Sequence, residues 1–214
     1  MEEGDKIIIL IGGGNGSGKK TLSRSIKDKL SKLLDNQVKI TEVDLDNSEE
    51  YCIDNEPPLK VSNYKFDHLL EDIDLCRGNG DIIIINGIFA LYDKNLRARS
   101  SIKIFVSCDK DTRLIRLIKR EGLCSEGIPV DEKNAKLSEV IQLHLMTRDD
   151  IIGKSESDII IKSGITDDDS NEKMGIELIV DFIIGLTKKE NSEKKDDGSK
   201  INLRDDIERF YELN

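Results

Sequence analysis

A glycine-rich stretch directly after an apolar run is the feature that most constrains the fold of this chain. The run Ile7–Ile11 leads into Gly13-Gly14-Asn15-Gly16-Ser17-Gly18-Lys19, and a segment with helical patterning follows. Glycines let successive backbone N–H groups turn toward a phosphate chain, and the start of a helix adds partial positive charge. The pattern therefore predicts a phosphate-binding loop between a strand and a helix, with Lys19 reaching the β- and γ-phosphates.

The residue after the loop lysine departs from this pattern. A Ser or Thr is usual there because its hydroxyl binds Mg²⁺, whereas this chain has Lys20 and then Thr21. A plain glycine turn is a simpler alternative, but such a turn rarely needs several glycines and a lysine. A dinucleotide-binding fold is another, since Asp44 lies near the position of its acidic residue, although its fingerprint lacks the lysine. The residues expected to bind ATP are Gly13, Gly14, Asn15, Gly16, Ser17, Gly18, Lys19, Lys20 and Thr21.

The other apolar runs predict the fold class. Short runs rich in Ile or Val lie at Val38–Val43, Ile82–Ile85, Ile102–Val106 and Ile159–Ile161. Such runs are typical of buried strands in a parallel sheet. Helical patterns separate them at Thr21–Leu34, Phe66–Cys76, Asp111–Arg120 and Glu132–Ile151. The alternation predicts an α/β fold, a three-layer sandwich with a mostly parallel sheet, in which ligands bind beyond the carboxyl ends of the strands.

Length and charge bear on domain organisation and on the classes of partner. The 214 residues suffice for one core, which we expect over residues 1–186, followed by a charged linker over 187–200 and a C-terminal helix over 201–214. A net charge of −10 argues against binding to nucleic acid or to an anionic membrane surface. Cysteines without C-x-x-C spacing, and the lack of a membrane-spanning apolar run, favour a cytoplasmic protein, with a nuclear location left open.

Two carboxylates follow the Val38–Val43 run. Asp44 and Asp46 would therefore lie at the same edge of the sheet as the glycine loop. A carboxylate at that edge can accept the proton of an attacking hydroxyl and can help to bind a metal ion. We assign this role to Asp44, while Asp46 is either its helper or a turn residue.

Several segments together resemble the uridine–cytidine kinase branch of the P-loop kinases. Besides the loop, the resembling motifs are Val43-Asp44, Phe66-Asp67-His68, Asn86-Gly87-Ile88-Phe89-Ala90-Leu91-Tyr92-Asp93 and Ser157-Asp158-Ile159-Ile160-Ile161. The resemblance extends from about Lys6 to Ser163. It implies transfer of the γ-phosphate of ATP, with Mg²⁺ as cofactor, to the 5′-hydroxyl of uridine or cytidine, the chemistry of pyrimidine salvage. Because members of the family are often oligomeric, it also suggests a homo-oligomer.

The resemblance assigns roles to individual residues. It implies that Lys19 stabilises the transferring phosphate and that Asp44 accepts the hydroxyl proton. Arg113 and Arg116, which share a helical face with Arg120, would balance the charge on that phosphate, although this spacing also suits a solvated face. The residues implied to bind the nucleoside are Asp67, His68 and Gln142.

The chain departs from the family pattern where the chemistry lies. The family binds Mg²⁺ through the hydroxyl after the loop lysine, the catalytic aspartate and a glutamate, and these positions hold Lys20, Asp44 and Asn86 here. Lysine offers no acceptor oxygen, so we expect a weakened metal site at Asp44 and Asn86. The base-binding hairpin of the family is missing, because only Leu69–Asp81 precedes the next strand, and the arginine-rich lid is missing as well.

Three functions therefore remain open. The first is uridine-kinase-like phosphorylation with weakened turnover. The second is a nicotinamide riboside kinase-like activity, which would suit the shortened nucleoside region, although Ala90–Asp93 favours the uridine kinase branch. The third is a nucleotide-binding pseudokinase with a regulatory or interaction role.

Overall fold

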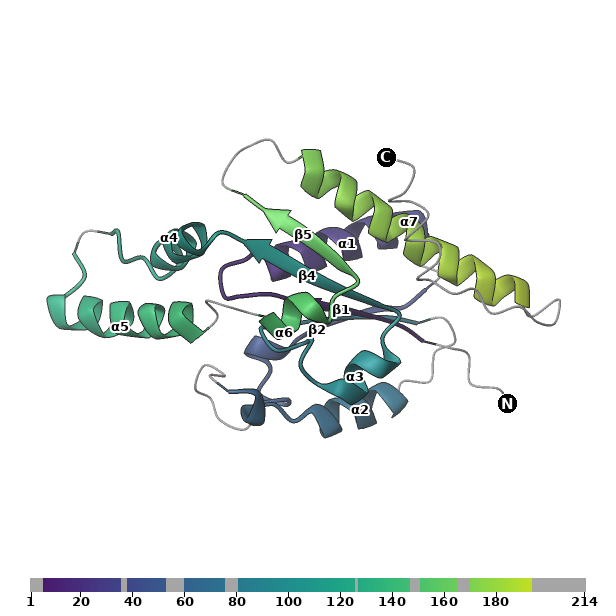
Figure 1. The fold of residues 1–214 in the computed structure, drawn as a ribbon, viewed down its shortest axis with the longest axis horizontal. Coiled ribbons are helices and arrows are strands. Elements are labelled where there is room, and N and C mark those ends of the chain that lie inside the picture. Colours follow the sequence, from purple (N-terminus) through teal and green to yellow (C-terminus); the bar gives the residue numbers. More distant parts are fainter. Residues whose placement is uncertain are drawn as a thin grey trace.

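Parallel strands run through the centre of the molecule, flanked by helices on both faces (Figure 1). The structure is a computed structural model that describes residues 6–35, 38–52, 60–75, 81–125, 127–146, 151–164 and 170–193. The strands are β1 (Ile7–Gly12), β2 (Ile40–Asp44), β3 (Ile82–Asn86), β4 (Ile102–Cys108) and β5 (Ile159–Ser163). Their order across the sheet is β2-β3-β1-β4-β5, and each pairing is parallel.

The alternation of side chains along β1 divides the core into two layers. Ile7, Ile9 and Ile11 face one layer, whereas Ile8 and Leu10 face the other. Helices α1 (Lys19–Leu33) and α7 (Ser170–Glu193) cover the first layer, and α2 (Phe66–Leu75) and α3 (Lys94–Arg99) cover the second (Figure 1). Burying one such side chain contributes about 1.5–3 kcal/mol, so the strand that leads into the glycine loop is firmly anchored.

Helices α4 (Lys110–Arg120) and α5 (Val130–Met146) lie near the carboxyl ends of the strands, whereas α6 (Ile151–Ser155) precedes β5 and lies over the middle of the sheet (Figure 1). The short 3₁₀ turn η1 (Leu45–Asn47) directly follows β2, and η2 (Val61–Asn63) precedes α2. The arrowheads of β4 and β5 point toward α4, and α5 extends beside it (Figure 1). Leu117, Leu123 and Val140 form a small separate apolar cluster that joins α4 to α5.

The predicted fold class is confirmed, since every expected strand is present in a parallel sheet between helical layers. The expected helix over Glu132–Ile151 is instead α5 and α6, and residues 147–150 lie outside the described residues. Helix α7 runs to Glu193, into the segment expected as a linker. The predicted helix over 201–214 lies outside the described residues, so the proposed division of the chain stays a prediction.

Among the described helices, none combines the length and the apolar character needed to cross a membrane.

Candidate functional site

The glycine loop follows β1 at the carboxyl edge of the sheet and leads directly into α1. Gly18 adopts the left-handed backbone conformation (φ 104°) at the start of this helix. Gly16 is also left-handed (φ 77°), and a Cβ there would lie 2.9 Å from the carbonyl oxygen of Arg113. Both positions therefore favour glycine, because a side chain would be strained by the backbone and, at Gly16, by the approach of α4. The structure thus provides the predicted strand–loop–helix setting for phosphate.

Lys19 is the first residue of α1 and its side chain is buried beneath the loop. Its Nζ donates a hydrogen bond to the carbonyl of Gly14 at 3.2 Å and lies 3.6 Å from Oδ2 of Asp46. Burial lowers the pKa of Lys19 below its ordinary value of 10.5, although the nearby carboxylates of Asp46 and Asp44 oppose the shift. A bound phosphate chain would supply further negative charge to an ammonium that is only partly compensated.

Asp46 is held by more partners than a turn residue needs. Its carboxylate accepts hydrogen bonds from the Tyr64 hydroxyl at 2.8 Å and from the backbone N–H of Ile88 at 2.8 Å. These contacts join the turn after β2 to the residues after β3 and position the partner of Lys19. Burial and the adjacent Asp46 raise the pKa of Tyr64, so its hydroxyl stays a donor. The sequence left the role of Asp46 open. The signal that could have identified its role is its position two residues after Asp44, the aspartate that ends β2.

Asp44 ends β2 and contacts the lysine that replaces the usual hydroxyl residue. Lys20 Nζ lies 2.8 Å from Asp44 Oδ2, and the side-chain amide of Asn47 donates to the same oxygen at 2.8 Å. Half of the Lys20 side chain is exposed, and both Lys20 and Asp44 line the cavity over the loop. An ammonium and an amide therefore occupy one oxygen of the carboxylate expected to act in catalysis.

Asn86 ends β3 beside Asp44 in the sheet register and is buried. Its amide nitrogen donates to Glu42 Oε1 and to the carbonyl of Val43, both at 3.4 Å, and to Ser23 Oγ at 3.5 Å. The Ser23 hydroxyl in turn donates to Glu42 Oε1 at 2.6 Å. Asn86 is thus the neutral donor that a carboxylate at position 42 requires. A glutamate at position 86 would place two carboxylates against each other. The sequence did not identify Glu42.

The positions expected to bind Mg²⁺ do not fit that ion. Mg²⁺ takes oxygen ligands in near-octahedral geometry, whereas position 20 supplies an ammonium that contacts Asp44. The amide nitrogen of Asn86, which lines the cavity, donates to Glu42 and to the carbonyl of Val43. Asp44 is therefore the one carboxylate of the three positions, and a cation of the protein already neutralises it.

A cavity of about 1190 Å³ lies over the loop, somewhat larger than a typical small-molecule site. The loop and strand ends contribute Lys19, Lys20, Asp44, Asp46 and Asn86 to its lining. Helix α5 contributes Glu139, Val140 and Leu143. The cavity therefore joins the phosphate loop to a partly apolar wall that could contact the rest of a nucleotide or nucleoside.

The three arginines of α4 occupy different environments. Arg116 lines the cavity, and its guanidinium donates to Ser163 Oγ at 3.1 Å and to the carbonyl of Gly164 at 2.6 Å. Arg120 also lines the cavity but is exposed, and it pairs with Glu121 at 2.9 Å. Arg113 is buried, and its charge helps to lower the pKa of Lys19, after the larger effect of burial. The structure thus brings Arg116 and Arg120 to the cavity and buries Arg113 in the packing of α4.

The residues expected to bind the nucleoside lie away from the described lining of this cavity. Asp67 is exposed on α2 and borders a second hollow of about 570 Å³. Gln142 is exposed on α5, next to Leu143, which does line the main cavity. Their roles stay predictions.

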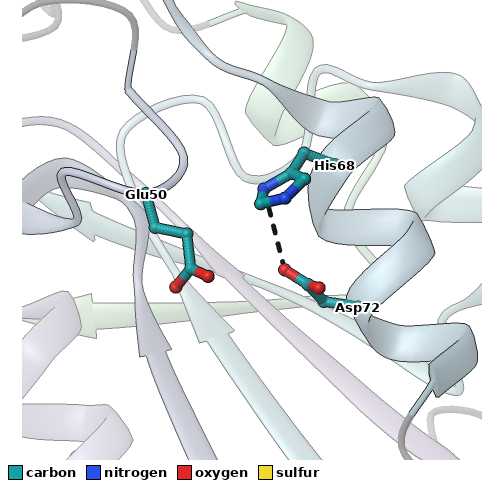
Figure 2. Close-up of side chains that lie close together, drawn as sticks. All are labelled: Glu50, His68 and Asp72. Carbon is teal, nitrogen blue, oxygen red and sulfur yellow. Dashed lines mark ion pairs between the residues drawn. The ribbon is translucent and has the colours of Figure 1, made fainter.

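His68 lies in an exposed polar cluster on the outer side of α2. Its Nδ1 is 3.7 Å from Asp72 Oδ2, and the carboxylate of Glu50 lies opposite this pair (Figure 2). Tyr51 donates to Asp72 Oδ2 at 3.0 Å, and the Tyr51 and His68 rings are 5.9 Å apart. These contacts give His68 local structural partners, and its role toward a substrate stays a prediction.

Known proteins resemble this chain in sequence and in fold. Residues 9–136 match the model of the AAA domain family AAA_18. The chain is 30% identical over 168 residues to the uridine kinase of Streptococcus pneumoniae (strain Hungary19A-6), which covers 65% of this chain and 74% of that enzyme. It is 29% identical over 199 residues to the Saccharomyces cerevisiae protein DAS2, a proposed uridine kinase. That match covers 85% of this chain and 79% of DAS2. The crystal structure of a proposed fructose transport system kinase from Silicibacter sp. TM1040 has a similar fold, with a TM-score of 0.53 at 14% identity over 73% of this chain and 89% of that one.

Proposed function

This chain belongs to the uridine kinase family of P-loop kinases, as a divergent member, and from that premise we propose that it phosphorylates uridine or cytidine. The phosphate donor is ATP and the acceptor is the 5′-hydroxyl of the nucleoside. The observation that carries this proposal is the position of Asp44, which shares one cavity with Lys19 and the glycine loop at the strand ends. A base and a phosphate-binding lysine around one cavity are the minimum that such a transfer requires.

In the proposed reaction, the 5′-oxygen forms a bond to the γ-phosphorus while the bond to the β,γ-bridging oxygen breaks and ADP leaves. Asp44 accepts the proton of the hydroxyl. Lys19 and the backbone N–H groups of the loop stabilise the charge on the phosphate oxygens, and Arg116 adds positive charge from the cavity wall.

The same geometry supports slow turnover. Lys20 and Asn47 both donate to Oδ2 of Asp44, so an incoming hydroxyl competes with them for this carboxylate. This contact is also the observation that favours the second candidate function, a pseudokinase that binds the nucleotide without transferring phosphate. The two functions differ in whether the Lys20–Asp44 contact opens when substrates bind.

The physiological setting follows from the proposed reaction. A uridine or cytidine kinase acts in pyrimidine salvage, and we propose a cytoplasmic location for this protein. A homo-oligomer stays a prediction from the resemblance.

The test is a transfer assay with ATP labelled at the γ-phosphate and a panel of uridine, cytidine and nicotinamide riboside. The proposal expects labelled uridine or cytidine monophosphate, lost in Asp44→Asn. The matched control is Asp28→Asn, which removes one exposed carboxylate from α1 and should leave the product unchanged. Labelled nicotinamide mononucleotide would move the assignment to another substrate class. Bound ATP without labelled product would contradict the kinase function and leave the pseudokinase.

A further inference from the structure

The start of α1 carries more positive charge than the phosphate loop alone requires. Lys19 and Lys20 are the first two residues of the helix, and its first turn contains no acidic residue. The N-terminus of a helix already carries partial positive charge, so two lysines there are unfavourable unless anions lie nearby. Asp46 and Asp44 each contact one of them, at 3.6 Å and 2.8 Å. The local arrangement therefore suits a strongly anionic ligand.

Lys20 occupies the position at which a divalent cation would need an oxygen ligand. The Lys20 ammonium contacts the carboxylate of Asp44, and the amide nitrogen of Asn86 is bonded to Glu42 and Val43. A Mg²⁺ ion would have to displace Lys20 from Asp44 and would then lie beside a second positive charge. The donor set and the charges both disfavour the ion.

We propose that this chain binds ATP in its metal-free form, with the ammonium of Lys20 supplying the positive charge that Mg²⁺ supplies in other phosphate-loop proteins. The inference rests on the nucleotide site of the proposed function, although it does not require phosphate transfer. Lys20 replaces the metal in charge and not in coordination. It carries one positive charge and three donors, which can contact the Asp44 carboxylate and phosphate oxygens together.

The rest of the cavity supplies the charge that one lysine cannot. ATP without a metal carries about four negative charges, whereas Mg²⁺ would neutralise two of them. Lys19 lies under the loop, and the guanidinium groups of Arg116 and Arg120 line the same cavity. The loop N–H groups and the helix start add partial positive charge. Lys20 is the group within this set that occupies the place of the missing metal ligand.

The test measures the affinity of the full-length protein for ATP by isothermal titration calorimetry, once with EDTA and once with MgCl₂. We expect the wild-type affinity in EDTA to lie within about threefold of the affinity in MgCl₂. Lys20→Thr restores the hydroxyl of the usual pattern and removes the ammonium. It should bind ATP at least about tenfold more weakly than wild type in EDTA and regain affinity when MgCl₂ is added.

Two further variants separate the role of Lys20 from a general effect of charge. Lys20→Met removes the ammonium without supplying an oxygen, so its affinity should be low under both conditions. Lys29→Met removes one lysine from the same helix, where Nζ contacts Glu177 at 3.4 Å on the outer surface, and should bind ATP as wild type does. Melting temperatures of the variants identify any loss of folding. Because the Lys20 side chain is half exposed, we expect the Lys20 variants to melt at nearly the wild-type temperature.

Three results would overturn the inference. They are a wild-type affinity that falls more than about threefold in EDTA, an absence of ATP binding in both conditions, and Lys20→Met binding that equals wild type in EDTA. Failure of the proposed function is a different observation. Metal-independent binding without labelled nucleotide product would uphold this inference and contradict the kinase, whereas product formation with strictly Mg²⁺-dependent binding would do the reverse.

Discussion

At the scale of single residues, the site is a set of lysines paired with carboxylates around a glycine loop. Lys19 contacts Asp46 and Lys20 contacts Asp44. The loop, Lys19 and the position of Asp44 could be predicted from the sequence because they follow a fixed spacing after a strand. The partners could not, since Tyr64 and Ile88 reach Asp46 from segments far along the chain.

The buried lysine makes stability depend on pH. Burial lowers the pKa of Lys19 in the folded protein, whereas the unfolded chain keeps the ordinary value of 10.5. Between these two values the unfolded state binds more protons, so the contribution of this group to the free energy of unfolding rises with pH. As the pH is raised toward 10.5, the free energy of unfolding, measured by denaturant titration, should rise less for Lys19→Met than for wild type. Equal slopes for the two proteins would contradict the assigned shift.

Asn86 should resist replacement by the glutamate of the family. Asn86→Glu would place a carboxylate beside Glu42, which now accepts from the Asn86 amide, and should lower the free energy of unfolding by about 1–3 kcal/mol. Adding Glu42→Gln should recover most of this loss, because the amide can donate to the new carboxylate. Urea unfolding of both single variants and the double variant measures the coupling. Strictly additive effects would show that residues 42 and 86 do not interact.

At the scale of the elements, the strands were predictable and the short turns were not. The strands are buried and rich in Ile, so their sequences carry a clear signal. Helix α3 has only six residues and begins at an Asp93 cap that accepts from Leu96 N–H at 2.7 Å. Such a short segment has no periodicity to detect. The separation of Arg113 from Arg116 and Arg120 depends on how α4 packs against the loop, which spacing on one helix face does not reveal.

The contact between α4 and the neighbouring strand ends should depend on Arg116. Its guanidinium donates to Ser163 and Gly164 beyond β5 and lies 3.4 Å from the loop carbonyl of Gly16. Arg116→Met should lower the melting temperature and weaken ATP binding by at least about tenfold. Arg120→Met is the matched control for the melting temperature alone, because Arg120 is exposed and pairs with its neighbour Glu121, and it should leave the melting temperature nearly unchanged. A larger thermal effect at Arg120 than at Arg116 would contradict this assignment.

At the scale of the whole molecule, the fold follows from the order of buried strands and helices, whereas the chemistry depends on two substituted positions. The glycine loop, the parallel sheet and the family resemblance all indicate a phosphate-binding scaffold. The family resemblance also implied that Lys20 and Asn86 stand where the family has a hydroxyl residue and a glutamate. It could not show that Lys20 contacts Asp44 or that Asn86 donates to Glu42, because those contacts depend on side-chain directions across neighbouring elements.

Helix α7 sets where the chain can be shortened. Ile179 and Ile183 are fully buried and pack in the layer that includes α1. A chain ending at Glu193 keeps this packing, so its melting temperature and ATP affinity should equal those of the full chain. A chain ending at residue 169 exposes that layer and should not fold. A large loss of stability in the longer variant, measured by thermal unfolding, would show that residues 194–214 contribute to the fold.

Transfer of phosphate is the central claim, and a single-turnover reaction tests it most directly. Excess protein is mixed with a trace of γ-labelled ATP and saturating uridine, so that slow product release cannot hide the chemical step. The account predicts that the label moves to uridine monophosphate in one slow phase and that Asp44→Asn abolishes this phase. Labelled ATP that binds and remains intact in the presence of uridine and of cytidine would contradict the account.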